Sequence, residues 1–81
     1  MPVILRYKGY KFYFFSNEGE PLEPPHVHVR KDECQAKFWL KPVVSLDESY
    51  GFSATELNEL LKVVEENREL MEAKWNEHFN R

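Results

Sequence analysis

Apolar and polar residues alternate in short runs through the first half of the chain, as they do in β-strands. The runs Val3–Tyr7 and Tyr10–Ser16 are rich in β-branched and aromatic residues, and Lys8-Gly9 separates them. Two residues that include a glycine are enough for a tight turn, so this segment predicts a first hairpin. Residues 17–24 contain one glycine and two prolines and are expected to form a loop.

A second pair of runs follows, Pro25–Lys31 and Cys34–Leu40, separated by Asp32-Glu33. It predicts a second hairpin, again with a two-residue turn. Pro42 ends the last run, because proline has no N–H to donate to a neighbouring strand. Val43–Leu46 is expected to add a short edge strand. The first half of the chain therefore predicts an antiparallel meander of four or five strands.

The period of the pattern changes to that of a helix after residue 52. Ser53 and Glu56 have the spacing of a capping box, in which each side chain binds a backbone N–H of the first turn. Apolar residues then recur at helical spacing, at Leu57, Leu60, Leu61, Val64, Met71, Trp75 and Phe79, and neither proline nor glycine interrupts residues 54–81. The chain thus predicts one α+β domain over residues 1–81. Residues 1–52 form the sheet, and residues 53–81 form one long C-terminal helix packed on one face.

The predicted helix is longer than the sheet beneath it. Roughly 26 helical residues span about 40 Å, whereas a seven-residue strand spans about 23 Å. Met71, Trp75 and Phe79 lie in the overhanging turns, and leaving such side chains in water forgoes roughly 1.5–3 kcal/mol each. The 17–24 loop, a bend of the helix back onto its own sheet, or a second chain would cover them. We expect a second chain, and therefore a homodimer with these residues at its interface.

Composition limits the class of protein. The chain of 81 residues is 42% hydrophobic and 15% aromatic, which is enough for a packed core. No apolar run approaches the roughly 18 residues of a membrane span, and the first residues do not resemble a signal peptide. Cys34 is the only cysteine, which excludes an internal disulfide. We expect a cytoplasmic protein that uses no cofactor and no membrane.

The net charge of −3 is distributed unevenly. Residues 53–81 carry four basic and seven acidic residues, whereas residues 1–52 carry seven of each. The whole acidic excess therefore belongs to the predicted helix. An acidic chain argues against indiscriminate nucleic-acid binding, although a local basic patch remains compatible with it.

Alternation along the two hairpins assigns the side chains to two faces. With two-residue turns, the apolar face has the pairs Tyr7/Tyr10, Leu5/Phe12, Val3/Phe14, Val29/Ala36 and Val27/Phe38, and the polar face has Arg6/Lys11, Ile4/Tyr13, Arg30/Gln35, His28/Lys37 and His26/Trp39. The helix is expected to cover the apolar face. The predicted polar face then gathers Arg6, Lys11, Tyr13, His26, His28, Arg30, Gln35, Lys37 and Trp39, with no acidic residue among them.

Two histidines on this face raise the question of a metal. His26 and His28 lie two apart on one strand and project the same way, but zinc needs at least a third protein ligand. Cys34 is expected on the opposite face, while Glu23 and His78 lie in a loop and at a distant helix end. We therefore expect no metal site. Two interpretations without chemistry stay open: a face that is merely solvated, and a face that binds another protein or a second copy of the chain.

Metal-free cleavage of a phosphodiester needs a group that exchanges protons near neutral pH, and cations that stabilise the developing charge. His28 or His26 has the first property. Arg30 and Lys37 have the second, so these four are the candidate catalytic residues. Phosphate contact and the stacking of unpaired bases are assigned to Arg6, Lys11, Tyr13 and Trp39.

Several segments in order carry a family resemblance: the opening MPVILRYKGYKFYFFSNEGEP, then PPHVHVRK, AKFWLKPV, GFSATEL and the closing ENRELMEAKWNEHF. Over essentially the whole chain they resemble the domain-of-unknown-function family 4160. The resemblance implies a small prokaryotic protein whose gene lies beside one for a partner of domain-of-unknown-function family 2442, the two being proposed as a toxin–antitoxin module. It matches residues 25–29 and 36–39 position by position and assigns none of them a role.

The combined expectation is a toxin-like component of a two-gene module that acts on RNA, or contacts other nucleic acid, through the polar face. Whether the protein is an enzyme stays open, and metal-independent endoribonuclease-like activity is one form that this action could take. The alternative is a non-enzymatic protein-interaction or regulatory module, such as an antitoxin. Motifs of common enzyme classes, namely Walker A, GxSxG and HExxH, are absent from the sequence.

Overall fold

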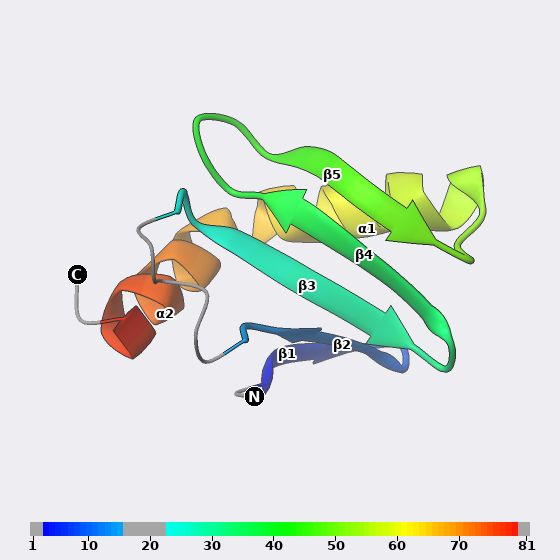
Figure 1. Ribbon diagram of the computed structural model, residues 1–81, viewed down its shortest axis with the longest axis horizontal. Helices are drawn as coiled ribbons and strands as arrows, with labels where there is room; N and C mark the ends of the chain where they lie inside the picture. Colours follow the sequence, from blue (N-terminus) through cyan, green and yellow to red (C-terminus); the bar gives the residue numbers. More distant parts are fainter. Residues whose placement is uncertain (1–2, 16–22, 80–81) are drawn as a thin grey trace.

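The computed structural model describes residues 3–15 and 23–79, which form a five-stranded sheet and two helices in a two-layer α+β arrangement (Figure 1). The strands are β1 (Val3–Tyr7), β2 (Tyr10–Tyr13), β3 (His26–Lys31), β4 (Cys34–Trp39) and β5 (Ser45–Tyr50), and the helices are α1 (Ala54–Glu66) and α2 (Arg68–Phe79). The sheet order is β1-β2-β3-β4-β5 and every neighbouring pair is antiparallel. The predicted antiparallel meander with helix on one face is confirmed.

Two tight turns set the register of both hairpins. Lys8 and Gly9 have φ of 47° and 84°, and Asp32 has φ of 55°. A two-residue turn with positive φ matches the twist of the flanking strands. Tyr7 consequently pairs with Tyr10. All five pairs predicted for the second hairpin are present, from Arg30/Gln35 through Val29/Ala36, His28/Lys37 and Val27/Phe38 to His26/Trp39.

The sheet differs from the prediction at its two edges. The register of the first hairpin shifts between Val3 and Leu5, so Val3 pairs with Tyr13, and the expected pairs Val3/Phe14 and Ile4/Tyr13 are wrong. The last strand is Ser45–Tyr50 and not Val43–Leu46, because the chain needs the residues after Pro42 to reverse direction. A second shift lies between Lys37 and Phe38.

The core lies between the sheet and α1. Alternate residues of β2, β3 and β4 meet the apolar stripe of α1, and the buried residues include Phe12, Val27, Val29, Ala36, Phe38, Leu60, Val63 and Val64. The capping box predicted at the start of α1 is present: the Glu56 N–H donates to Ser53 Oγ at 3.1 Å, and the Ser53 N–H donates to Glu56 Oε1 at 2.9 Å.

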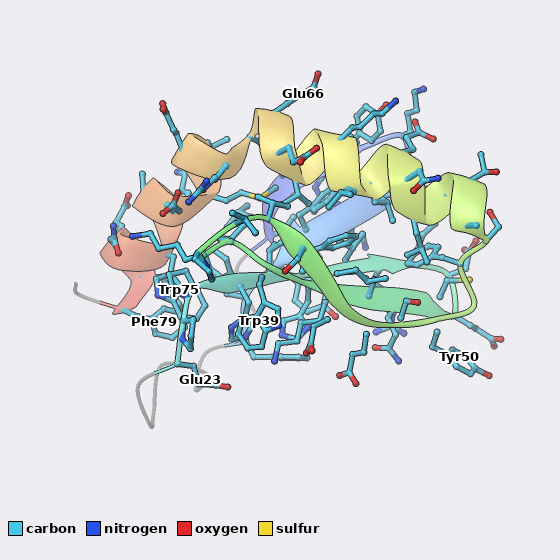
Figure 2. All side chains as sticks on the ribbon, turned by 90° about the horizontal axis from the view of Figure 1, so that it is seen from above. Glu23, Trp39, Tyr50, Glu66, Trp75 and Phe79 are labelled. Atoms are coloured by element: carbon cyan, nitrogen blue, oxygen red, sulfur yellow. The ribbon has the colours of Figure 1, made fainter. Side chains whose placement is uncertain are left out.

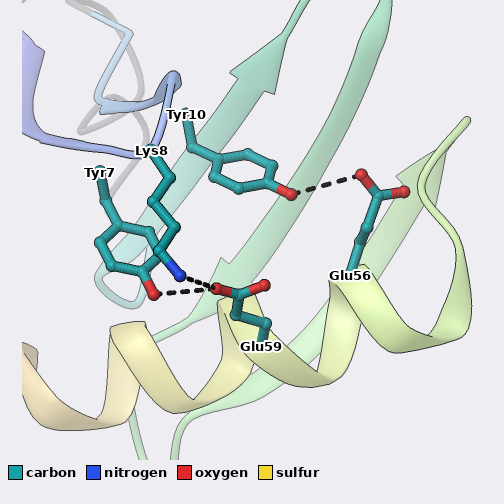
Figure 3. Close-up of polar contacts among 5 residues, drawn as sticks. All are labelled: Tyr7, Lys8, Tyr10, Glu56 and Glu59. Carbon is teal, nitrogen blue, oxygen red and sulfur yellow. Dashed lines mark hydrogen bonds and ion pairs between the residues drawn. The ribbon is translucent and has the colours of Figure 1, made fainter.

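Polar contacts tie the first hairpin to α1 (Figure 3). The Tyr7 hydroxyl donates to Glu59 Oε2 at 2.8 Å and Lys8 Nζ lies 3.3 Å from the same oxygen. These hydrogen bonds, the one from Tyr7 first, lower the pKa of the Glu59 carboxyl. One turn earlier the Tyr10 hydroxyl donates to Glu56 at 3.3 Å. The hairpin that carries Arg6 and Lys11 is therefore held at a fixed position on the helix.

The C-terminal helical segment bends at Asn67, so the prediction of one long helix is wrong. Asn67 Nδ2 donates to the Val63 carbonyl at 2.8 Å, which competes with the regular backbone ladder. Its backbone has φ −110° and ψ 16°, outside the helical range. The Met71 N–H donates to the Asn67 carbonyl at 2.9 Å, so α2 begins directly after the bend.

Contacts to the loop after β4 hold α2 in its turned position. Arg68 Nε donates to Glu72 Oε2 at 3.0 Å, and Arg68 Nη2 donates to the Pro42 carbonyl at 3.2 Å. Lys41 Nζ lies 3.3 Å from the other oxygen of Glu72. The first turn of α2 is thereby fixed to the segment that joins β4 to β5.

The bend brings the apolar residues of α2 into the core of their own chain. Met71 is fully buried and Trp75 is 1% exposed, and Figure 2 shows Trp75 and Phe79 beneath α2 at the end of the sheet. The Trp75 ring lies 5.2 Å from that of Phe14 and 4.2 Å from that of Phe79. The expectation that Met71, Trp75 and Phe79 need cover from a second chain is wrong. The homodimer stays a prediction, without this support.

Candidate nucleic-acid interface

The sheet face opposite α1 carries the polar residues that alternation predicts for it. We call it the open face and define it by Arg6, Lys11, Tyr13, His28, Arg30, Gln35, Lys37, Trp39, Glu48 and Tyr50. The strand register arranges these side chains in rows that cross the strands. Figure 2 shows the labelled Trp39 and Tyr50 on the side of the sheet away from α1.

One row that crosses all five strands begins with three cations. Arg6 pairs with Lys11 and Lys11 with Arg30, and we call these three the cationic row. All three side chains are exposed. Directly opposed residues on one face have Cβ atoms about 4.5–5.5 Å apart, so like charges there destabilise the sheet. The row continues through Gln35 to Tyr50.

No acidic partner offsets this repulsion within the part of the chain that the structure describes. The ion pairs there involve Lys8, Lys37, Lys41 and Arg68. Arg30 Nε does approach Asp32, but it donates to the backbone carbonyl at 3.3 Å and not to the carboxylate. A hollow of about 570 Å³ lies beside the row, and its lining includes Lys11, Arg30 and Lys31 together with the acidic Asp32. The repulsion within the row is therefore not offset by a carboxylate of the described chain.

Lys37 is engaged within its own chain. Its Nζ lies 3.6 Å from Asp47 Oδ2 and 4.4 Å from the centroid of the Trp39 ring, and the side chain is only 16% exposed. When a lysine ammonium already interacts with a carboxylate and an aromatic ring, its net attraction for a phosphate is smaller. The structure therefore weakens Lys37 as a stabiliser of developing phosphorane charge.

The two histidines are close together but have different surroundings. His28 is half-buried, with its ring stacked on Tyr13 at 5.6 Å and its ring centroid 4.5 Å from that of Phe15. His26 is fully buried, 5.3 Å from His28. The prediction that His26 belongs to a solvent-facing cluster is wrong, because α2 turns round the end of the sheet and Trp75 covers the ring at 5.0 Å. His26 Nδ1 also lies 3.0 Å from the Pro24 carbonyl.

The predicted stacking residues are less accessible than expected. Tyr13 is 5% exposed, so its ring offers almost no surface to a base and that expectation is wrong. Trp39 is half-buried, with Lys37 over one part of its ring and His26 at 5.3 Å. Arg6, Lys11 and Arg30 remain the accessible members of the predicted set.

Two residues of the open face escape the sequence prediction, because β5 lies further along the chain than expected. Glu48 pairs with Lys37 and Tyr50 with Gln35, so the open face does contain an acidic residue and that expectation is wrong. Tyr50 is 70% exposed. The signal in the sequence is the alternation of Glu48 and Tyr50 with the smaller Ser49, ended by Gly51.

Neither a metal site nor a membrane span is found in residues 3–15 and 23–79. No three His, Cys, Asp or Glu side chains in these ranges are grouped closely enough to hold a metal ion. Among the described helices, neither α1 nor α2 has the length and apolarity that crossing a bilayer requires.

Comparison with known proteins gives a family and no function. Neither the curated proteins nor the solved structures contain a match. A family model matches residues 9–76, which include four of the five strands, the cationic row except Arg6, α1 and most of α2. With most of its length matched, the chain belongs to the family described as a domain of unknown function, DUF4160.

Proposed function

We propose that the protein contacts RNA, or another nucleic acid, through its open face, and that it does so as the toxin-like component of a two-gene module. The cationic row is the observation that carries the proposal. Three exposed cations stand side by side in a chain whose net charge is −3. Phosphates of a nucleic acid would remove the repulsion among them and release counterions.

Binding of a nucleic acid to the open face is better supported than its cleavage. General acid–base chemistry needs an accessible titrating group within reach of the substrate. His26 is buried and Lys37 is paired with Asp47, so two of the four residues assigned to catalysis are not presented to a substrate. Cleavage, if the protein performs it, depends on His28 with Arg30 as the nearest exposed cation on the same strand.

Salt dependence of RNA binding tests the proposal. Three phosphate contacts give a slope of log K against log salt of about −2 for a single strand, since each contributes roughly −0.7. Lys11→Gln and Arg30→Gln should each weaken binding and flatten the slope by about 0.7 between roughly 50 and 200 mM salt. Lys62→Gln is the matched control, because Lys62 is exposed on α1.

The outcomes of this measurement are distinct. Equal slopes for the wild type and for both row variants would contradict the proposal, as would an absence of binding to any RNA at low salt. A loss of affinity in Lys62→Gln as large as in Lys11→Gln would show that only overall charge matters. Thermal unfolding of each variant confirms that the fold is unchanged.

A second candidate, a non-enzymatic interaction or antitoxin-like module, has one observation in its favour. Strand β5 pairs with β4 on one side only, and Leu46 on β5 and Val43 before it are 42% and 62% exposed. An exposed edge of this kind accepts an added strand from another protein. The test is co-purification with the small protein encoded by the neighbouring gene, expected to be of the domain-of-unknown-function 2442 type. Loss of that complex in Leu46→Lys, with RNA binding intact, would favour this candidate.

A further inference from the structure

An exposed aromatic ring stands at the far end of the row that begins with the three cations. Tyr50 is the last residue of β5 and is 70% exposed, more than Val43, Leu46 or any other exposed large apolar residue of the described chain. It pairs with Gln35, which in turn pairs with Arg30. The ring is therefore two strands from the nearest cation of the row, or about 10 Å.

A hollow beside Tyr50 brings together groups of the kind that bind a flat polar molecule. It measures about 360 Å³, and its lining includes His28, Gln35, Lys37, Glu48 and Tyr50. This volume is within the range of small-ligand sites, roughly 300–1,000 Å³. One wall is thus an aromatic ring, and the others offer an amide and a carboxylate. The cationic row lies outside this hollow, apart from the shared strand β3.

We propose that this hollow binds one unpaired nucleobase, guanine in preference to the others, of a strand whose phosphates lie on the cationic row. The inference rests on the proposed function and extends it from phosphate contact to base recognition. The base stacks on Tyr50, because every base has a π-face and stacking tolerates any sequence. The preference among bases then comes from hydrogen bonds to its edge.

Glu48 supplies the preference. Lys37, which is its cross-strand neighbour, places its Nζ against Asp47 and not against Glu48, so the Glu48 carboxylate is available as an acceptor. A carboxylate accepts two parallel hydrogen bonds, and guanine is the base with two adjacent N–H donors on its Watson–Crick edge. That edge is occupied in a duplex, so the hollow selects unpaired bases.

The geometry also gives the strand a direction. The row crosses the sheet perpendicular to the strands, from Tyr50 on β5 to Arg6 on β1, which is four strand spacings or about 19 Å. An RNA bound in this way passes its base into the hollow at the β5 end and its backbone over Arg30 and Lys11. Tyr13 takes no part in stacking, since it is buried.

Binding of labelled single-stranded RNA tests the inference. The probes are an oligouridine, the same oligouridine with one central guanosine, and the second probe in a duplex. Tyr50→Ala should weaken binding of the guanosine probe about fivefold or more, as expected from the loss of roughly 1 kcal/mol of stacking. Tyr50→Phe should bind like the wild type, because stacking needs the ring and not the hydroxyl. Val43→Ala is the control for an exposed apolar side chain outside the row.

Glu48→Gln should remove the preference for guanosine over uridine while leaving the salt slope unchanged. Equal affinity of Tyr50→Ala and wild type, with Lys11→Gln and Arg30→Gln still weakened, would overturn the base subsite and leave the proposed function standing. Equal affinity for the single strand and the duplex would overturn it as well. An absence of binding by the wild type would overturn both. All the substituted side chains here are exposed, so loss of folding does not confuse the result.

Discussion

Replacing Trp75 by Ala should destabilise the monomer strongly and at every protein concentration. The Trp75 side chain is 1% exposed and packs against Phe14, His26 and Phe79, with ring centroids between 4.2 and 5.2 Å. Truncation removes the ring that joins α2 to the end of the sheet. Phe14 and His26 are themselves fully buried rings, so they have little freedom to fill the space, and Phe79 is only partly buried.

The magnitude follows from comparable truncations. Trp or Phe to Ala in a packed core costs about 3–5 kcal/mol, whereas a domain of 81 residues has a total stability of roughly 4–12 kcal/mol. At about 4–8 °C per kcal/mol for a domain of this size, the Tm of Trp75→Ala should fall by about 15 °C or more. The variant should be close to unfolded at physiological temperature.

The assay is thermal unfolding followed by circular dichroism at two protein concentrations, together with the mass in solution. Leu70→Ala is the matched control on the same helix, since Leu70 is 42% exposed and surface changes usually cost within about 0.5 kcal/mol. A wild-type Tm that falls on dilution, combined with a dimeric mass lost in Trp75→Ala, would refute the reasoning. It would mean that the tryptophan is buried against another chain.

Three further expectations concern single positions. Gly51→Ala should lower the free energy of unfolding by about 1–3 kcal/mol, and by more than Gly9→Ala does. Both glycines have positive φ, but a Cβ at Gly51 would lie 2.8 Å from Cys34 Sγ, whereas at Gly9 the nearest atom is 3.4 Å away. Equal losses of stability in urea unfolding would contradict this. The hydrogen bond from the Ser53 backbone N–H lowers the pKa of the Glu56 carboxyl below 4.5. The ionised carboxylate therefore contributes to the stability of the fold above that pH, and this contribution is lost as the pH falls through the lower pKa of the folded state. The Tm difference between the wild type and Glu56→Gln should shrink in acid, and a constant difference would count against this explanation. His26→Ala should destabilise the fold by about 2 kcal/mol or more, as truncations in a packed core do. His28→Ala should lower the Tm less, because His28 is only half-buried. A larger fall in Tm for His28→Ala than for His26→Ala would contradict the burial of His26.

The hairpins were predictable because their registers depend on local chemistry. Turns of two residues at Lys8-Gly9 and Asp32-Glu33 fix the pairing next to each turn, and alternation then assigns each side chain to a face. In the first hairpin this holds only as far as Leu5, where the register shifts. In the second hairpin, His28 pairs with Lys37 as expected. The capping box at Ser53 and Glu56 was predictable for the same reason, since both partners lie within one turn.

Features that depend on distant segments were not predictable. Alternation placed His26 correctly beside Trp39, but it gives the face of a side chain and not its exposure. The burial of His26 comes from Trp75, almost 50 residues later in the chain. The bend at Asn67 likewise depends on the packing of α2 against the end of the sheet. The helical pattern of the sequence continues through Asn67 without interruption and gives no sign of the bend. The start of β5 depends on how the chain turns after Pro42. Because the predicted strand ended at Leu46, the prediction did not include Glu48 and Tyr50.

The open face is electrically divided, and that division bears on how a nucleic acid would lie on it. Arg6, Lys11 and Arg30 occupy β1 to β3, whereas Asp47 and Glu48 lie on β5, where Asp47 pairs with Lys37. A phosphate backbone is attracted to the first region and repelled by the second. Only the uncharged part of a nucleotide, its base, is compatible with the β5 end, and that is where the exposed ring of Tyr50 stands. Charge and shape on this face therefore favour the same orientation: backbone over β1–β3 and base towards β5.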